Sequence, residues 1–98
     1  MDVTLQYFDG CPHWRLADQR LREVAAERGF RITYRKVMSP DDAEALSFHG
    51  SPSILVDGRD PFAHDEPGGL ACRVYETPEG HAGSPTIDQL RAVLAEPR

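Results

Sequence analysis

The sequence predicts an α/β domain, and two patterns indicate it. Short segments that alternate apolar and polar residues are typical of strands. They are separated by segments whose apolar residues recur every three or four positions, as in helices. The 98 residues are 40% apolar and 28% charged, which is an ordinary composition for one globular domain with a modest core. We therefore expect residues 1–98 to form a single domain with the element order β-α-β-α-β-β-α.

The first half of the chain predicts a strand, a helix and a second strand. Residues 3–8 alternate and are rich in β-forming residue types, and a turn signal follows at residues 9–10. A helix is predicted from Pro12, which suits the first helical position, to a stop at Gly29. Its apolar stripe is predicted to consist of Trp14, Ala17, Leu21, Val24 and Ala25. Residues 30–37 alternate again. Two strands joined through a helix are expected to pair in parallel, with a right-handed crossover.

The second half predicts two helices and two further strands. Ser39 precedes a proline and two acidic residues, which is typical of a helix start, and this helix is expected to end by Gly50. Thr86, with Gln89 three residues later, predicts a capping box at the start of the last helix. The segments between them are predicted as a buried third strand, an irregular loop, a fourth strand and a Gly/Pro-rich loop: residues 53–56, 59–69, 70–76 and 77–85.

Charge and hydropathy exclude several classes of protein. The net charge of −5 argues against a nucleic-acid-binding protein, which normally carries a basic patch. No stretch approaches the roughly 20 apolar residues that a membrane span needs, and the N-terminus carries no basic-then-apolar export signal. We therefore expect a cytoplasmic protein that binds neither nucleic acid nor membranes, and we predict no bound cofactor or metal.

Cys11 is the residue around which a function can be predicted. A thiol at or beside a helix N-cap faces unpaired backbone N–H groups and the positive end of the helix dipole, and both favour the thiolate. Protonated His13 could stabilise that thiolate, or it could be an exposed polar residue. Trp14 is predicted to pack and to form one wall of the thiol site. The alternative for Cys11 is a small buried core residue.

The element order, the motif Cys11-Pro12-His13-Trp14 at the helix start and Ser51-Pro52 before the third strand resemble the thioredoxin/glutaredoxin superfamily. The resemblance covers essentially the whole chain. It implies a four-stranded mixed sheet flanked by helices, with Cys11 at the exposed end of the first strand. It also implies that Pro52 follows a cis peptide bond, with its loop against the reactive sulfur, where the family docks substrate.

The sequence departs from the usual Cys-x-x-Cys pair of that superfamily, because Trp14 occupies the fourth position. A mixed disulfide at Cys11 would then be resolved by an external thiol or by Cys72. We expect a thiol-disulfide oxidoreductase whose partners are a low-molecular-weight thiol or a protein disulfide. The candidate residues are catalytic Cys11 and Cys72 and substrate-binding Pro12, His13, Trp14, Ser51 and Pro52.

Cys72 supports an alternative. The stretch Cys72-Arg73-Val74-Tyr75 and its separation from Cys11 are similar to organomercurial lyase, a thioredoxin-like family that uses two cysteines and an aspartate to break a carbon–mercury bond. Trp14 stands where the lyase carries its aspartate, so the proton donor is missing. The alternatives are soft-metal or iron–sulfur binding by the same fold, or a non-catalytic binding module. In a simple hairpin with the third strand, Cys72 would instead be a buried strand residue far from Cys11.

The loop around residues 57–66 contains adjacent candidate ligands. His64, Asp65 and Glu66 lack the spacing that converges on one metal ion, so a solvated loop is predicted. Phe62 is the exception, because an aromatic residue in a polar loop usually packs back onto the protein, here over the thiol site. His49 and His81 have no evident partner, and Asp9 is assigned to a turn.

Overall fold

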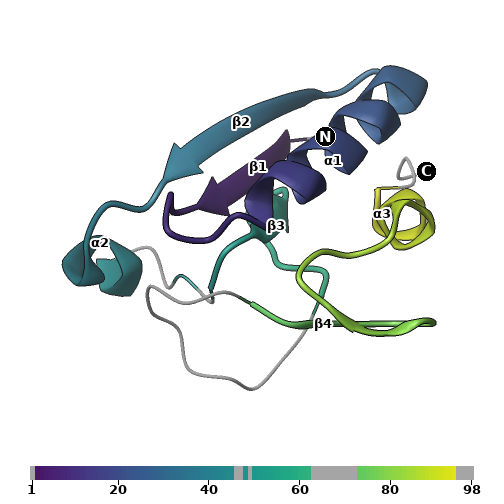
Figure 1. Cartoon of the computed structure of the whole chain (residues 1–98). Coiled ribbons are helices and arrows are strands. Elements are labelled where there is room, and N and C mark those ends of the chain that lie inside the picture. The colour runs from purple at the N-terminus through teal and green to yellow at the C-terminus, as the bar shows by residue number, and fades with distance from the viewer. Residues whose placement is uncertain (1, 46–47, 49, 63–72, 95–98) are drawn as a thin grey trace.

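The computed structural model describes residues 2–45, 48, 50–62 and 73–94. The predicted α/β class and the β-α-β-α-β order are confirmed (Figure 1). The elements in chain order are β1 (Asp2–Tyr7), α1 (Trp14–Arg28), β2 (Arg31–Lys36), α2 (Pro40–Ala45), β3 (Ser53–Val56), β4 (Tyr75–Thr77), β5 (Gly80–Ala82) and α3 (Ile87–Val93).

The main sheet is mixed and has the strand order β2-β1-β3. β1 and β2 are parallel, with a register that runs from Asp2 opposite Arg31 to Tyr7 opposite Lys36. The parallel pair predicted across the first helix is therefore confirmed. β3 is antiparallel to β1 and places Ile54 opposite Leu5. β1 is thus the central strand, and its carboxyl end leads directly into the turn that carries Cys11.

The predicted fourth strand of this sheet is wrong for the part that the structure describes. β4 starts at Tyr75 and pairs with β5 in a separate two-stranded hairpin. The chain reverses because Gly80 has a φ of 111° and the Thr77 hydroxyl accepts a hydrogen bond from the Glu79 N–H (3.2 Å). The segment predicted as a Gly/Pro-rich loop therefore contains a strand. Residues 70–72 of the predicted strand lie outside the described residues.

The core lies between one face of the sheet and the two longer helices. α1 packs against this face, and α3 lies beside α1 (Figure 1). The apolar stripes predicted for both helices are confirmed, because Leu21 and Val24 of α1 and Leu90 of α3 are fully buried. The main cluster consists of Val3, Leu5, Leu21, Val24, Ile54, Leu90 and Leu94. β1 is thus covered by helices on the side that bears Leu5.

α2 lies beyond the carboxyl end of β2, away from α1 and α3 (Figure 1). It covers a second, smaller cluster formed by Val37, Ala43 and Phe48, against which Phe8 packs. The predicted starts of α2 and α3 are confirmed by side-chain caps. Ser39 Oγ accepts a hydrogen bond from the backbone N–H of residue 42 (3.1 Å), and α3 begins with a complete capping box.

In the part of the chain that the structure describes, no helix is both long enough and apolar enough to cross a bilayer.

Candidate functional site

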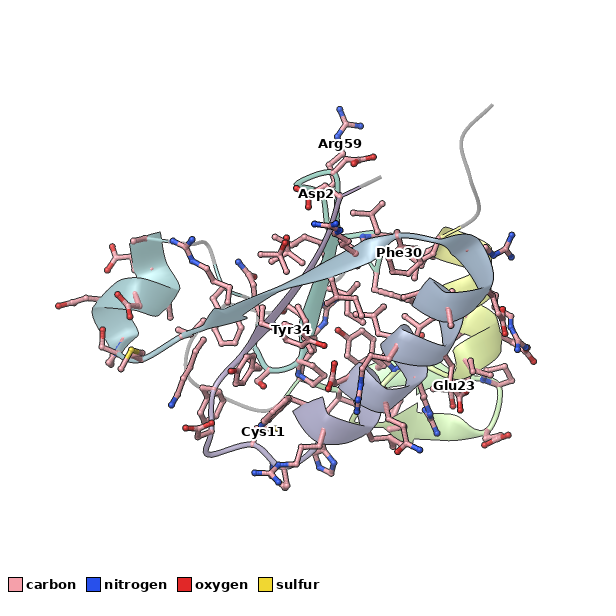
Figure 2. All side chains as sticks on the ribbon, turned by 90° about the horizontal axis from the view of Figure 1, so that it is seen from above. Asp2, Cys11, Glu23, Phe30, Tyr34 and Arg59 are labelled. Carbon is pink, nitrogen blue, oxygen red and sulfur yellow. The ribbon has the colours of Figure 1, made fainter. Side chains whose placement is uncertain are left out.

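Cys11 lies in the turn between β1 and α1, at the end of the sheet opposite Asp2 and Arg59 (Figure 2). The Cys11 N–H donates to the Phe8 carbonyl (3.2 Å), so the chain folds back before the helix starts. α1 begins at Trp14 with His13 as its N-cap, two residues later than predicted. Cys11 is therefore not beside the N-cap.

The late helix start has a local cause. The Arg15 N–H reaches the Pro12 carbonyl at 3.4 Å, a spacing of three residues, and the first α-helical bond runs from Ala17 N to the His13 carbonyl (3.3 Å). Pro12 therefore belongs to a tight turn instead of the first helical position.

The Cys11 side chain is fully buried, with 0% of its surface exposed. Cys11 follows the carboxyl end of β1, as the resemblance implied, but its side chain is buried, as the alternative of a buried cysteine predicted. The segment before β3 lies against the sulfur, because Cys11 Sγ is 3.4 Å from the carbonyl oxygen of Ser51. Any reagent that reacts with this sulfur must displace part of that cover.

Ser51 and Pro52 are joined by a cis peptide bond, as the resemblance implied. The prediction that their loop lies against the Cys11 sulfur is also confirmed. Ser51 is fully buried, and its Oγ accepts a hydrogen bond from the Phe8 N–H (3.3 Å). Both oxygens of Ser51 therefore face the turn that carries Cys11, and Ser51 connects β3 to that turn.

The outer rim of the site consists of Pro12 and His13, which are both exposed. A Cβ atom on Gly83 would lie only 2.4 Å from the His13 ring, so the absence of a side chain at Gly83 permits this close contact. Trp14 is half-buried and stacks on Tyr7 with ring centroids 4.2 Å apart. The packing role predicted for Trp14 is confirmed.

Cys72 lies outside the described residues, but its neighbour Arg73 is described. The Arg73 N–H donates to the Ser51 carbonyl oxygen at 2.9 Å, the same oxygen that lies against Cys11 Sγ. The chain at residue 73 is therefore level with the start of β3, at the site end of the sheet. This differs from the simple hairpin considered above, because β4 pairs with β5 and not with β3.

The Arg73 side chain is buried and paired. Only 2% of it is exposed, and its guanidinium contacts the Asp60 carboxylate through two bonds, Nη1 to Oδ2 at 2.6 Å and Nη2 to Oδ1 at 3.3 Å. Nη1 also lies 3.4 Å from Ser53 Oγ, and Nη2 donates to the Phe62 carbonyl. The buried charge is thus neutralised and its donors are used, which is what makes a buried arginine tolerable.

Tyr75 completes this buried group. Its hydroxyl donates to the Pro52 carbonyl at 2.5 Å, and its ring lies 4.5 Å from the Arg73 guanidinium carbon. Phe62 packs edge-on against the Tyr75 ring, with centroids 5.3 Å apart. Phe62 therefore packs back onto the protein as predicted, and the described contact is with Tyr75. Burial raises the pKa of the Tyr75 hydroxyl above its usual range, although the Arg73 charge acts in the opposite direction.

The buried tyrosine predicts a loss of stability in alkali. An unfolded chain releases a tyrosine proton near pH 10, whereas folded Tyr75 retains it to higher pH. The unfolded state then binds fewer protons, so the free energy of unfolding falls as the pH rises above about 10. Urea unfolding between pH 8 and 11.5 should show a smaller fall for Tyr75→Phe than for the parent protein. Equal falls in the two proteins would contradict this assignment.

The sequence patterns did not predict the buried group formed by Asp60, Arg73 and Tyr75. Simple alternation would bury Val74 and expose its neighbours, yet Val74 is 54% exposed while Arg73 and Tyr75 are buried. Asp60 precedes Arg73 by 13 residues, a spacing typical of no motif. The one available signal was the position of Arg73 and Tyr75 in the stretch that resembles the lyase.

Other candidate ligands contribute nothing to this site. His64, Asp65, Glu66 and His49 lie outside the described residues, and among those described no group of three or more His, Cys, Asp or Glu side chains converges. His81 is exposed, with Nε2 3.8 Å from a Glu76 carboxylate oxygen. Asp9 lies in a turn as predicted, and its carboxylate pairs with Lys36 at 2.5 Å.

The described residues therefore place the Cys11 sulfur against the Ser51 carbonyl and next to the exposed Pro12 and His13. Comparison with protein-family models and with curated protein sequences gives no match to this chain.

Proposed function

We propose that this protein is a thioredoxin-like thiol-disulfide oxidoreductase in which Cys11 is the nucleophile and Cys72 the resolving thiol. The Cys11 thiolate attacks one sulfur of a substrate disulfide and expels the other half as a thiolate. Cys72 then attacks the Cys11 sulfur of the mixed disulfide and releases the second half. The resulting Cys11–Cys72 disulfide is reduced by an external low-molecular-weight thiol, which is itself oxidised.

The observation that supports this proposal is the shared contact at the Ser51 carbonyl oxygen. Cys11 Sγ lies 3.4 Å from this oxygen and Arg73 N lies 2.9 Å from it, so these two atoms are within roughly 6 Å of each other. Cys72 directly precedes Arg73 in the sequence, which makes it the candidate for the resolving thiol.

The exposed side chains of Pro12 and His13 favour a substrate that approaches the site from the solvent. Pro12 and His13 are accessible beside the covered sulfur, and the His13 ring is positioned by its contact with Gly83. The His13 imidazole is a group that can donate a proton to the departing thiolate. We propose that these two residues contact the substrate, whereas buried Ser51 and Pro52 position the sulfur from behind.

The two cysteines can be tested separately by serine substitution. Reduction of bis(2-hydroxyethyl) disulfide and of insulin is measured with glutathione as reductant. Cys11→Ser should lower turnover at least about 100-fold, because no nucleophile remains. Cys72→Ser should retain the first step, so that mass spectrometry detects a mixed disulfide at Cys11, and should lose turnover.

The matched pair of variants gives distinct outcomes. Turnover by Cys11→Ser at the rate of the parent protein would overturn the proposal. Full turnover by Cys72→Ser would instead overturn the role of Cys72 and identify the external thiol as the resolving group.

The same pair of thiols favours one alternative, a two-thiolate site for a soft metal ion. Among the described residues no cluster of His, Cys, Asp or Glu offers further ligands, so such a site would depend on the cysteines alone. Stoichiometric soft metal in the purified protein, lost in both Cys11→Ser and Cys72→Ser, together with no disulfide reduction, would support the alternative over the redox function.

A further inference from the structure

Each residue of the segment Ser51–Ser53 is contacted by a polar group of Arg73 or Tyr75. The Arg73 N–H donates to the Ser51 carbonyl (2.9 Å), the Tyr75 hydroxyl donates to the Pro52 carbonyl (2.5 Å), and Arg73 Nη1 lies 3.4 Å from Ser53 Oγ. Two residues, Arg73 and Tyr75, therefore contact three consecutive residues of the segment that covers Cys11.

These bonds are made in a buried environment, so their loss is costly. Ser51 and Ser53 are 0% and 1% exposed, and Tyr75 is 4% exposed. A buried carbonyl that loses its donor bears most of its desolvation cost, which makes one such hydrogen bond worth roughly a factor of ten in an equilibrium. The Asp60 carboxylate fixes the guanidinium through two bonds, so the Arg73 side chain has little freedom to leave the Ser53 hydroxyl.

The same segment contributes to the surroundings of the Cys11 sulfur. The Ser51 carbonyl lies 3.4 Å from Sγ, and Ser51 Oγ accepts from the Phe8 N–H of the turn that carries Cys11. Displacing residues 51–53 would therefore remove one of the groups that cover this sulfur, which is now 0% exposed.

We propose that Arg73 and Tyr75 are positioning residues that fix the Ser51 carbonyl against Cys11, and that Asp60 supports them by fixing Arg73. They control how often the sulfur becomes accessible, without touching the substrate. The proposal rests on the reactive Cys11 of the function proposed above, and it identifies residues that regulate access to that site.

Alkylation of Cys11 by iodoacetamide tests this control directly. In a Cys72→Ser background Cys11 is the only cysteine of the chain, so the labelling rate reports the accessibility and thiolate fraction of Cys11 alone. Tyr75→Phe removes only the hydroxyl that reaches Pro52, and Arg73→Lys retains the charge but loses the fork that matches a carboxylate. Each should raise the labelling rate in native buffer roughly tenfold, the size expected for one buried hydrogen bond.

Two matched controls remove comparable interactions elsewhere. Tyr34→Phe removes a hydroxyl that donates to Asp18 (2.5 Å), and Arg91→Lys removes a forked pair with Glu27 (3.0 and 2.7 Å). Labelling through local release is insensitive to low urea concentrations, whereas labelling through global unfolding rises with urea. The controls should match the parent without urea and rise only as urea increases.

The outcomes separate a positioning role from a structural one. Urea-independent acceleration in Tyr75→Phe and Arg73→Lys supports the proposal, and Tyr75→Phe decides it if Arg73→Lys does not fold. Unchanged labelling, or labelling that rises only with urea as in the controls, would overturn it. Disulfide turnover is measured independently: unchanged labelling with Cys11-dependent turnover refutes the positioning role alone, whereas accelerated labelling without Cys11-dependent turnover refutes the redox function alone.

Discussion

Replacing Asp60 with alanine is expected to lower the free energy of unfolding by about 3–5 kcal/mol, the usual cost of removing one partner from a buried ion pair. The Arg73 side chain is 2% exposed and has its carboxylate partner at 2.6 Å. Without that carboxylate the guanidinium remains buried and uncompensated. The loss is a large part of the roughly 5–15 kcal/mol that stabilises a typical domain, and urea unfolding at neutral pH measures it.

Glu27→Ala is the matched control for Asp60→Ala. It also removes the carboxylate of a forked pair with an arginine, but Glu27 and Arg91 are 42% and 41% exposed, so solvent screens the interaction and the loss should be much smaller. The double variant Asp60→Ala/Arg73→Met also removes the guanidinium charge that Asp60→Ala leaves buried and unpaired. It should therefore be more stable than Asp60→Ala alone. Equal losses for Asp60→Ala and Glu27→Ala would show that burial of the pair has no energetic effect.

Leu21→Ala is expected to destabilise the protein by about 2–5 kcal/mol, the usual range for truncating a buried leucine. Leu21 is fully buried on the face of α1 that contacts the sheet and belongs to the same cluster as Leu5 and Leu90. The cavity left by the substitution would lie between the helix layer and the sheet. The midpoint of urea unfolding should fall accordingly, with the slope unchanged.

Leu16→Ala provides the control within the same helix. Leu16 is 43% exposed, so its truncation should change stability by no more than about 0.5 kcal/mol. Both substitutions change helix propensity equally, and their difference therefore isolates burial. A loss for Leu16→Ala as large as that for Leu21→Ala would contradict the assignment of the helix faces.

The elements that the sequence predicted best are those that local chemistry determines. The apolar spacing of α1, the stop at Gly29 and the capping box at Thr86 and Gln89 depend on residues within one or two turns of each other. All are present in the structure: Gly29 has a φ of 79°, and Gln89 N lies 3.1 Å from Thr86 Oγ1. The cis bond before Pro52 was implied by the family resemblance and could not be derived from local spacing.

The environment of the candidate site depends on long-range contacts, and there the sequence was less informative. The Cys11 sulfur lies against a carbonyl 40 residues away, at Ser51. The fourth strand was misassigned because alternation alone does not distinguish a strand that pairs with β3 from one that turns back at Gly80. The pairing of Arg73 with Asp60 was not predicted, since no local pattern connects them.

The position of β2 has a consequence for how copies of this protein meet. β2 pairs only with β1 among the described strands, so it forms an edge of the main sheet, and five of its six residues are exposed. Such an edge can pair with a strand of another molecule and start aggregation. Here the strand carries Arg31, Arg35 and Lys36, so edge-to-edge pairing of two copies would bring like charges together. The basic residues of β2 therefore disfavour self-association through this edge, although the net charge of the protein is −5.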